Sequence, residues 1–217
     1  MNRNLTARSV VRVFVLTLVS VLGSASLLPL AFGQAAGPEG PERPCLLSSS
    51  AFMLANLDSK DSPQFCQLAL GYRLSRTDVL ALEFITWRYF HPLGIPYGPS
   101  FDSDDERYPG RVRGTGAGLA YQHYWWRGLY TGAHATGLRQ SYEDLDGRLI
   151  RHGFQLLTVA RLGYHVEFAR GRWYVEPSIA ATAWPINTNV PEEFKARDEK
   201  WKGYFLGEPG VMVGVRF

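Results

Sequence analysis

The chain has 217 residues, of which 46% are hydrophobic and 20% are charged, and its formal net charge is +3. The first 33 residues hold three arginines and no acid, so the remainder carries 23 − 3 = 20 basic residues (Lys and Arg) against 20 acidic ones. A near-neutral remainder offers no general basic surface for a nucleic-acid backbone, which argues against nucleic acid as the partner.

The amino terminus has the pattern of a secretory signal peptide. A basic start is followed by an apolar run and then by small residues that suit cleavage. A retained membrane anchor is the alternative, which the serines and the small-residue exit disfavour. We predict three regions: a cleaved signal peptide (1–33), a Pro- and Gly-rich periplasmic leader (34–45), and one folded domain (46–217).

The first segment of the domain, residues 46–57, is ambiguous. Its sequence LLSSSAFMLANL fits a first strand or a short amphipathic helix, and we favour the strand because it makes the strand count even. Cys45 and Cys66 flank this segment and could form a disulfide in an oxidising compartment. A full strand between them would hold the two sulfurs too far apart to bond, so the two predictions compete.

Seven further segments alternate between apolar and polar or small residues, as strands with one apolar face do. They are 65–75, 78–90, 112–126, 129–142, 152–168, 172–184 and 204–217. In the third of these, Gly114, Gly116 and Gly118 share one face. Glycine at alternate positions is costly in a strand unless bulky side chains cross that face or the wall bends there, as in a narrow barrel.

The connections alternate in length along the chain. Short turns are predicted at 76–77, 127–128 and 169–171, and longer loops at 58–64, 91–111, 142–151 and 185–202. All six tryptophans lie near predicted strand ends, which favours two aromatic girdles at the boundaries of a membrane. A soluble lipocalin-like barrel is the alternative, and the export signal and the long strands argue against it.

The last strand carries the most specific pattern. Val211, Val213, Val215 and the terminal Phe217 lie on one face, opposite small or charged residues. This pattern resembles the closing strand of small eight-stranded bacterial outer-membrane barrels, the class of the OmpA transmembrane domain, OmpX and OmpW. The resemblance implies an all-β, closed antiparallel up-and-down transmembrane barrel of about eight strands in the outer membrane. It also implies that the assembly machinery reads these four residues as a signal, but it implies no activity.

Strand alternation also places six charged residues inside the predicted barrel: Arg73, Glu83, Arg161, Glu176, Glu208 and Arg216. Unpaired buried charges are costly, so we expect the three acids to pair with the three bases, with Glu83, Arg161 and Glu176 at the core of the network. An ion-pair plug is favoured over a selectivity filter, because side chains can fill a barrel of eight strands.

No catalytic site, metal site or cofactor is predicted. His165 and Glu167 share a face near the short-turn end, where a solvated rim is favoured over a metal or acid–base pair. His134 and Thr136 form a His-x-Thr pattern similar to the His-x-Ser of lipid A deacylase barrels, but Thr replaces the nucleophilic Ser. The sequence holds no phosphate-binding Gly loop and no nucleophile elbow.

The predicted function is therefore structural or adhesive. The mixed-charge loop segments 102–107 and 192–202 would face lipopolysaccharide headgroups or bind a partner. The expected partners are outer-membrane lipid, lipopolysaccharide and the assembly machinery, and the expected state is a monomer. A narrow channel or carrier for small solutes is the first alternative, and an outer-leaflet lipid-modifying enzyme is the second.

Overall fold

The computed structural model describes residues 43–57 and 62–217, so the predicted signal peptide and most of the predicted leader lie outside the described residues. The strands are β1 (Cys45–Ser50), β2 (Cys66–Arg73), β3 (Asp78–Tyr89), β4 (Gly110–Trp126), β5 (Leu129–Asp144), β6 (Leu149–Tyr164), β7 (Val166–Phe168), β8 (Trp173–Thr188) and β9 (Tyr204–Arg216). Within these described residues, three short helices accompany the strands: η1 (Ala51–Leu57), η2 (Asp104–Glu106) and α2 (Glu192–Asp198).

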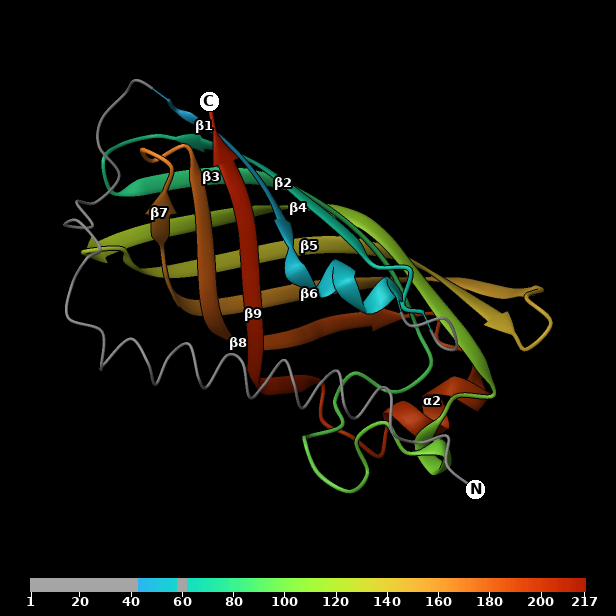
Figure 1. Ribbon diagram of the computed structural model, residues 1–217. Coiled ribbons are helices and arrows are strands. Elements are labelled where there is room, and N and C mark those ends of the chain that lie inside the picture. Colours follow the sequence, from blue (N-terminus) through green and yellow to red (C-terminus); the bar gives the residue numbers. More distant parts are fainter. Residues whose placement is uncertain (1–42, 58–61) are drawn as a thin grey trace.

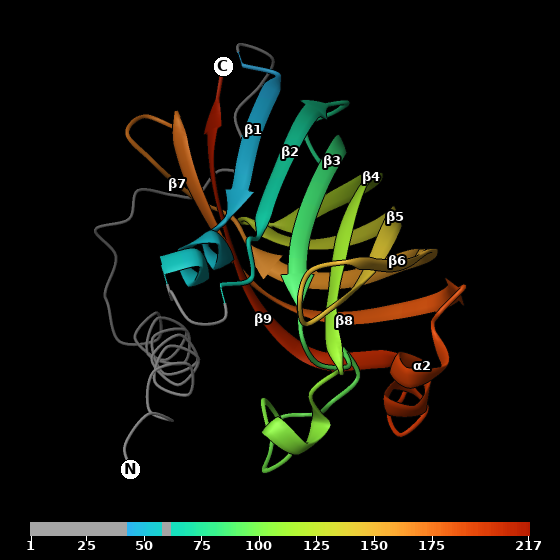
Figure 2. The ribbon, with the colours of Figure 1, turned by 90° about the vertical axis from the view of Figure 1, so that its right-hand side faces the viewer.

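Eight of the strands close into a ring (Figures 1 and 2). Each strand from β1 to β5 pairs antiparallel with the next one, β6 pairs with β8, β8 pairs with β9, and β9 returns to β1. The short strand β7 continues beyond His165 at the end of β6 and pairs with β8. The predicted closed, antiparallel up-and-down barrel of eight strands is confirmed.

Short turns and long connections lie at opposite ends of the barrel, which we name the turn end and the loop end. At the turn end, Arg127 and Gly128 both have positive φ (46° and 93°), as a tight hairpin turn requires. Cys45 also lies there, bonded through its backbone to Phe217. The carboxyl terminus and the start of β1 therefore lie together, away from α2 (Figure 1).

The outer surface of the barrel carries an apolar band. Residues on the predicted outward face are exposed on several strands, among them Leu68, Leu70, Leu80, Leu82, Phe84, Leu119, Leu162 and Ile179. An exposed apolar face with a polar interior is the arrangement of a barrel that crosses a membrane. In the part of the chain that the structure describes, no helix is long and apolar enough to cross a membrane.

The ambiguous segment 46–57 contains both predicted structures. It is a strand as far as Ser50 and a 3-10 helix from Ala51, so the prediction of a full strand is wrong in its second half. The side-chain amide of Asn56 joins η1 to the barrel wall: its Nδ2 donates to the carbonyl of Phe65, and its Oδ1 accepts from the Phe65 N–H, both at 2.7 Å. The amide thus makes the two bonds that a strand backbone would otherwise make.

The possible disulfide between Cys45 and Cys66 is not formed, and both cysteines are free thiols. Cys45 lies opposite Tyr72 in the β1–β2 register, at the other end of β2 from Cys66. A disulfide needs Cα atoms less than about 7 Å apart, which this register does not allow. Cys45, which the sequence places in the leader, is the first residue of β1.

Two further predictions at the loop end need correction. The predicted loop 142–151 is mostly strand, since β5 reaches Asp144 and β6 begins at Leu149, so this hairpin projects from the barrel (Figure 1). The second aromatic girdle lacks the tryptophans predicted for it, because Trp87 and Trp184 occupy inward positions and Trp201 lies in the last long connection. The exposed aromatic side chains near this end include Phe154 and Tyr204.

The girdle at the turn end is present. Its exposed aromatic residues are Tyr72, Tyr121, Trp125, Trp126, Tyr164, Phe168, Trp173 and Phe217. Rings of this kind favour the boundary between water and lipid, so this belt marks one edge of the apolar band.

Glycines make room for the large side chains of the lumen. A Cβ on Gly163 would lie 2.5 Å from the ring of Tyr130. In β4, the ring of Trp87 crosses Gly114, as the glycine pattern predicts, whereas Gly118 lies against the backbone of β5. Both explanations offered for the glycine pattern therefore apply, one at each position.

Candidate functional site in the barrel lumen

All six charged residues that the sequence places in the lumen occupy inward positions on their strands. They are Arg73, Glu83, Arg161, Glu176, Glu208 and Arg216. Arg73, Glu83, Glu176 and Arg216 are buried, whereas Glu208, nearest the loop end, is exposed. Their roles depend on what each one contacts.

Near the turn end, the buried carboxylate of Glu176 receives three side chains. Nδ1 of His165 lies 2.7 Å from its Oε1, and the hydroxyl of Tyr124 donates to the same oxygen at 3.0 Å. Nε2 of Gln122 donates to Oε2 at 3.3 Å. A buried carboxylate is tolerated when such donors satisfy its oxygens, so this cluster holds its charge inside the barrel.

The contacts continue from His165 towards the wall. Its Nε2 lies 3.1 Å from Oε1 of Glu167, and Nη1 of Arg216 donates to that oxygen at 2.5 Å. Carboxylates that are ionised accept hydrogen bonds and do not donate them, so both ring nitrogens of His165 are placed to donate. We name this set the turn-end chain: Gln122, Tyr124, Glu176, His165, Glu167 and Arg216.

His165 is the functional residue that the sequence interpretation missed. The prediction of a solvated rim is wrong for it, because it is 3% exposed and packs against the rings of Tyr124 and Tyr174. The signal was available, since His165 follows Arg161 and Gly163 at the spacing of two that keeps a residue on the inward face.

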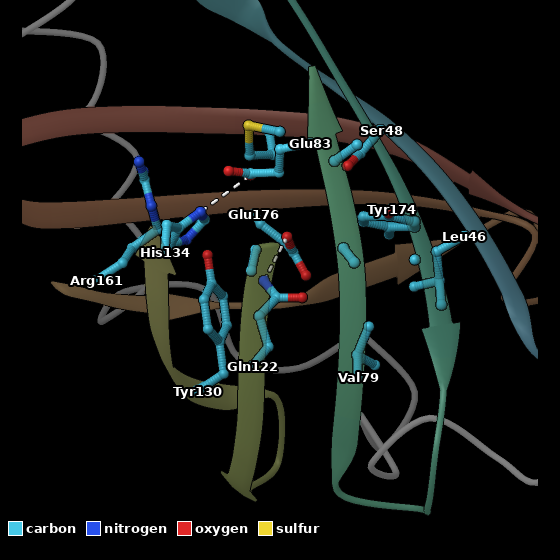
Figure 3. Close-up of a pocket in the computed structure, with 15 residues that line it drawn as sticks. Leu46, Ser48, Val79, Glu83, Gln122, Tyr130, His134, Arg161, Tyr174 and Glu176 are labelled. Carbon is cyan, nitrogen blue, oxygen red and sulfur yellow. Dashed lines mark hydrogen bonds and ion pairs between the residues drawn. The ribbon is translucent and has the colours of Figure 1, made fainter. Parts of the chain in front are cut away.

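In mid-lumen the side chains surround a small cavity of ≈ 30 Å³ (Figure 3). Oε1 of Glu83 lies 3.0 Å from Nδ1 of His134, and Nη1 of Arg161 donates to the hydroxyl of Ser178 at 2.7 Å. Glu83, His134 and Arg161 line this cavity together with Tyr130. The cavity has room for only a few water molecules.

Two buried nitrogens beside this cavity have no hydrogen-bond partner among the described residues: Nε2 of His134 and Nε of Arg161. Buried polar groups are normally paired with protein or with ordered water. The mid-lumen cavity is therefore polar and suited to water or a small anion.

The described contacts of the lumen acids run to side chains outside the predicted set. Glu83 and Glu176 contact His134 and His165, Glu208 accepts from Thr182 at 2.5 Å, and Arg216 contacts Glu167. Glu83, Arg161 and Glu176 line one cavity, but each contacts other side chains. Histidine and hydroxyl groups take the place that the prediction gave to arginine.

His134 and Thr136 face the lumen rather than the lipid. Thr136 is 4% exposed, and the Nδ1 side of His134 is occupied by Glu83. A carboxylate beside Nδ1 is how catalytic histidines are oriented, but the adjoining cavity is too small for a lipid substrate. Within residues 43–57 and 62–217, no group of three or more His, Cys, Asp or Glu side chains could hold a metal ion.

A second closure is built at the loop end, where α2 packs against inward-facing residues of β4 and β5; α2 and the connection between β3 and β4 lie beyond the strand ends (Figure 2). Phe194 of α2 is completely buried, with its ring centroid 5.0 Å from that of Tyr108 and 5.2 Å from that of Tyr142. Val112 joins the same apolar cluster. We name the connection 189–203, which contains α2, and residues 91–109 the loop-end cap.

The two parts of the cap are also held by polar contacts. Nζ of Lys200 donates to both carboxylate oxygens of Glu106, at 2.9 and 3.0 Å, and Tyr108 donates to Asp198. Burial raises the pKa of the Asp198 carboxyl, whereas the Lys200 ammonium lowers the pKa of Glu106. The loop segments 102–107 and 192–202, which we predict to face lipopolysaccharide headgroups or to bind a partner, thus contact each other.

The four residues of the predicted assembly signal lie on the outward face of β9 or directly after it. Val211, Val213 and Val215 alternate with inward residues, and Phe217 is exposed in the aromatic belt at the turn end. This placement is compatible with the predicted role, which stays a prediction.

The closed ring and its apolar exterior define the class: a small transmembrane β-barrel of eight antiparallel strands, of the kind found in bacterial outer membranes. Neither a protein-family model nor a curated protein matches the sequence. Among solved structures, Neisserial surface protein A (NspA) is similar with a TM-score of 0.44 and 14% identity, covering 80% of this chain and 93% of that chain. CarO2 of Acinetobacter baumannii is similar with a TM-score of 0.37 and 13% identity, covering 81% and 97%.

Proposed function

We propose that this chain is an integral outer-membrane protein that acts as a closed scaffold for an ordered surface outside the cell. In this orientation the turn end faces the periplasm and the loop end faces outward. The observation that carries the proposal is the double closure of the lumen, by the turn-end chain at one end and by the loop-end cap at the other. A transport route would have to open both.

The loop-end cap is the surface that would bind a partner. Its ion pair between Lys200 and Glu106 and its buried Phe194 support a fixed shape rather than two independent loops. Fixed loops on a rigid barrel are a common way to carry a binding site. The charged residues that remain exposed on α2 have both signs, Glu192, Glu193 and Lys195, which suits a polar partner rather than an apolar one.

Single-channel recording in a planar lipid bilayer tests the closed state. We expect no conductance steps from the wild-type protein, and steps from a variant that combines Glu176→Ala with Phe194→Ala, because both closures are then weakened. The matched control combines Glu193→Ala with Phe168→Ala, which removes the same residue types from exposed positions. Regular steps from the wild-type protein would contradict a closed scaffold.

A narrow passage for water or small ions is the second candidate. The mid-lumen cavity with its unpartnered nitrogens on His134 and Arg161 favours it, because such groups could hold a solute between the two closures. Conductance in the wild type that Arg161→Ala abolishes or enlarges would select this candidate over the closed scaffold.

A further inference from the structure

Aromatic rings connect η1 to the loop-end cap along the inner side of β3. Each ring centroid lies between 5.0 and 6.3 Å from the next one, which is within the range where aromatic rings attract each other. The contacts join one residue of η1, the residue before β2, two residues of β3 and two residues of the cap. We name this set the aromatic row: Phe52, Phe65, Trp87, Tyr89, Tyr108 and Phe194.

At one end of the row, η1 holds Phe65 in two ways. Asn56 makes both hydrogen bonds to its backbone, at 2.7 Å each. The ring of Phe52 meets the ring of Phe65 edge-on, with the centroids 5.0 Å apart and an angle of 83° between the planes. Phe65 is 6% exposed, so its position depends on packing and on these two bonds. If η1 moves away, Phe65 loses both kinds of contact.

In the middle of the row, Trp87 is oriented by its neighbouring rings. Its Nε1 is buried and has no hydrogen-bond partner among the described residues, so no polar contact fixes the indole. Phe65 stacks on the indole with 24° between the planes, and Tyr89 meets it at 85°. A buried N–H without a partner is costly, so another orientation in which Nε1 gains a partner competes with the present one. The contact with Phe65 opposes that change.

The attachment of η1 to the wall is weak compared with that of a strand. β1 pairs with β9 only as far as Ser50 and its partner Met212. Before Met212, β9 pairs with β8 alone among the described strands, and η1 lies beside β9 without joining the ladder. No strand pairing has to break for η1 to leave the wall. A segment of this kind opens locally at a low free energy.

The outer side of η1 is apolar and lies at the depth of the lipid. Phe52 is 47% exposed and Leu54 is 65% exposed. Met212, the partner of Ser50, is 217 − 212 = 5 residues from Phe217 in the aromatic belt. At about 3.4 Å per residue and a tilt near 40°, η1 begins roughly 13 Å from the belt along the barrel axis. This is inside a hydrocarbon core about 30 Å thick.

We propose that η1 and the loop-end cap form one coupled unit, in which attachment of η1 to the wall favours the docked cap. Attached η1 keeps Phe65 against Trp87, and Trp87 in this orientation supports Tyr89. The ring of Tyr89 is in turn the surface against which Tyr108 and, through it, Phe194 dock. Coupling between distant sites needs packed elements that have two arrangements, and η1, the indole and the cap are three such elements.

This inference rests on the proposed function, because it concerns the regulation of the external surface that the cap forms. It assigns that regulation to a part of the wall that contacts lipid, on the other side of β3 from the solvent-exposed cap. The wall strands take no part in the change, since both η1 and the cap are connections between strands.

Hydrogen exchange, measured by mass spectrometry on the folded full chain in lipid nanodiscs, tests the coupling. Phe52→Ala removes the first ring of the row, and Asn56→Ala removes the two bonds to Phe65. We expect each variant to exchange roughly threefold to tenfold faster in the cap segment 189–203, since packed networks couple sites by modest free energies. Phe168→Ala is the matched control, because its ring is 47% exposed like that of Phe52 but lies in the belt at the turn end. It should leave the cap unchanged.

Trp87→Leu tests the route of the coupling. In this background, Phe52→Ala should cause no further acceleration in residues 189–203, because the row is already interrupted. A faster band on an unheated denaturing gel first shows that each variant is folded. Three results would overturn the proposal: cap exchange like that of the wild type in Phe52→Ala or Asn56→Ala, equal acceleration in Phe168→Ala, or the full effect of Phe52→Ala in the Trp87→Leu background. None of these measurements depends on conductance, so the coupling and the closed scaffold can fail separately.

Discussion

The two closures of the lumen differ in their chemistry and in their origin. The turn-end chain is polar, and all of its members lie on strands of the wall or between them, as with Glu176 on β8 and His165 between β6 and β7. The loop-end cap is mostly apolar at its centre, and its completely buried side chain, Phe194, comes from a connection. One closure is therefore part of the barrel, whereas the other is attached to it.

This difference predicts different responses to mutation. Removing a member of the turn-end chain leaves its partners buried and unsatisfied, and the wall strands that carry them are strained or destabilised. Removing an apolar contact of the cap weakens only the attachment of a loop, because the strands beneath it keep their backbone hydrogen bonds. The barrel and its cap should thus be separable by experiment.

The largest expected effect is that of Glu176→Ala. The change removes one of the two carboxylates that contact His165, and it leaves the donor groups of Tyr124 and Gln122 without an acceptor. The free energy of unfolding should therefore fall by about 3–5 kcal/mol. Chemical denaturation in detergent micelles measures it. Glu193→Ala, an exposed acid of α2, is the control and should leave the midpoint unchanged. A loss no greater than that of the control would show that the turn-end chain contributes nothing to stability.

A smaller and more local effect is expected for Phe194→Ala. Loss of this buried ring should lower the free energy of opening of the cap by about 3 kcal/mol, while global unfolding changes little. Hydrogen exchange of residues 189–203 should accelerate, and the unheated protein should still migrate as a compact band. If the midpoint of global unfolding shifts as far as it does for Glu176→Ala, the cap is not separable from the barrel.

The smallest effect concerns pH. The raised pKa of Asp198 means that the docked cap binds a proton more readily than the open one, so docking strengthens as pH falls through that raised pKa and weakens as pH rises through it. The lowered pKa of Glu106 acts in the opposite sense: its contribution is present above the usual pKa and is lost as pH falls through the lowered one. Docking should therefore be tightest under mildly acidic conditions and weaken again at lower pH.

Hydrogen exchange of residues 189–203 at several pH values, corrected for the intrinsic exchange rate, checks this order. In Asp198→Asn, docking of the cap should no longer strengthen on mild acidification, but it should still weaken at lower pH. The variant can still dock, because its side-chain amide oxygen can accept the hydrogen bond from Tyr108. An unchanged profile in this variant would assign the gain to another group.

The sequence was sufficient for the wall of the barrel. Alternation over residues such as Arg73, Glu83 and Val213 fixes which face each strand turns to the lipid, and the alternation of short and long connections fixes the topology. The same alternation, followed from Glu83 to Trp87, would have placed Trp87 inside the barrel and not in the second girdle. That error came from using distance to the strand end without the face of the strand.

The partners of the lumen charges could not be predicted in the same way. Glu176 contacts Tyr124, which lies on a strand that is not its neighbour in the ring, so their meeting depends on the width of the lumen. The cap was missed because Phe194 is surrounded by charged residues, and a charged loop is normally solvated. The change from strand to helix at Ser50 also lacks a sequence signal, since the residues on both sides fit either structure.

The seam between β1 and β9 has a consequence for how the chain folds. Its register runs only from Leu46 to Ser50, whereas the register of β4 and β5 runs from Gly110 to Trp126. The seam joins the two ends of the domain, so it has the largest loop-closure entropy of any strand pair and should form last. It also has few backbone bonds to lose. The pairing of β1 with β9 should therefore form at the end of folding and be the first strand pairing to separate when the barrel unfolds.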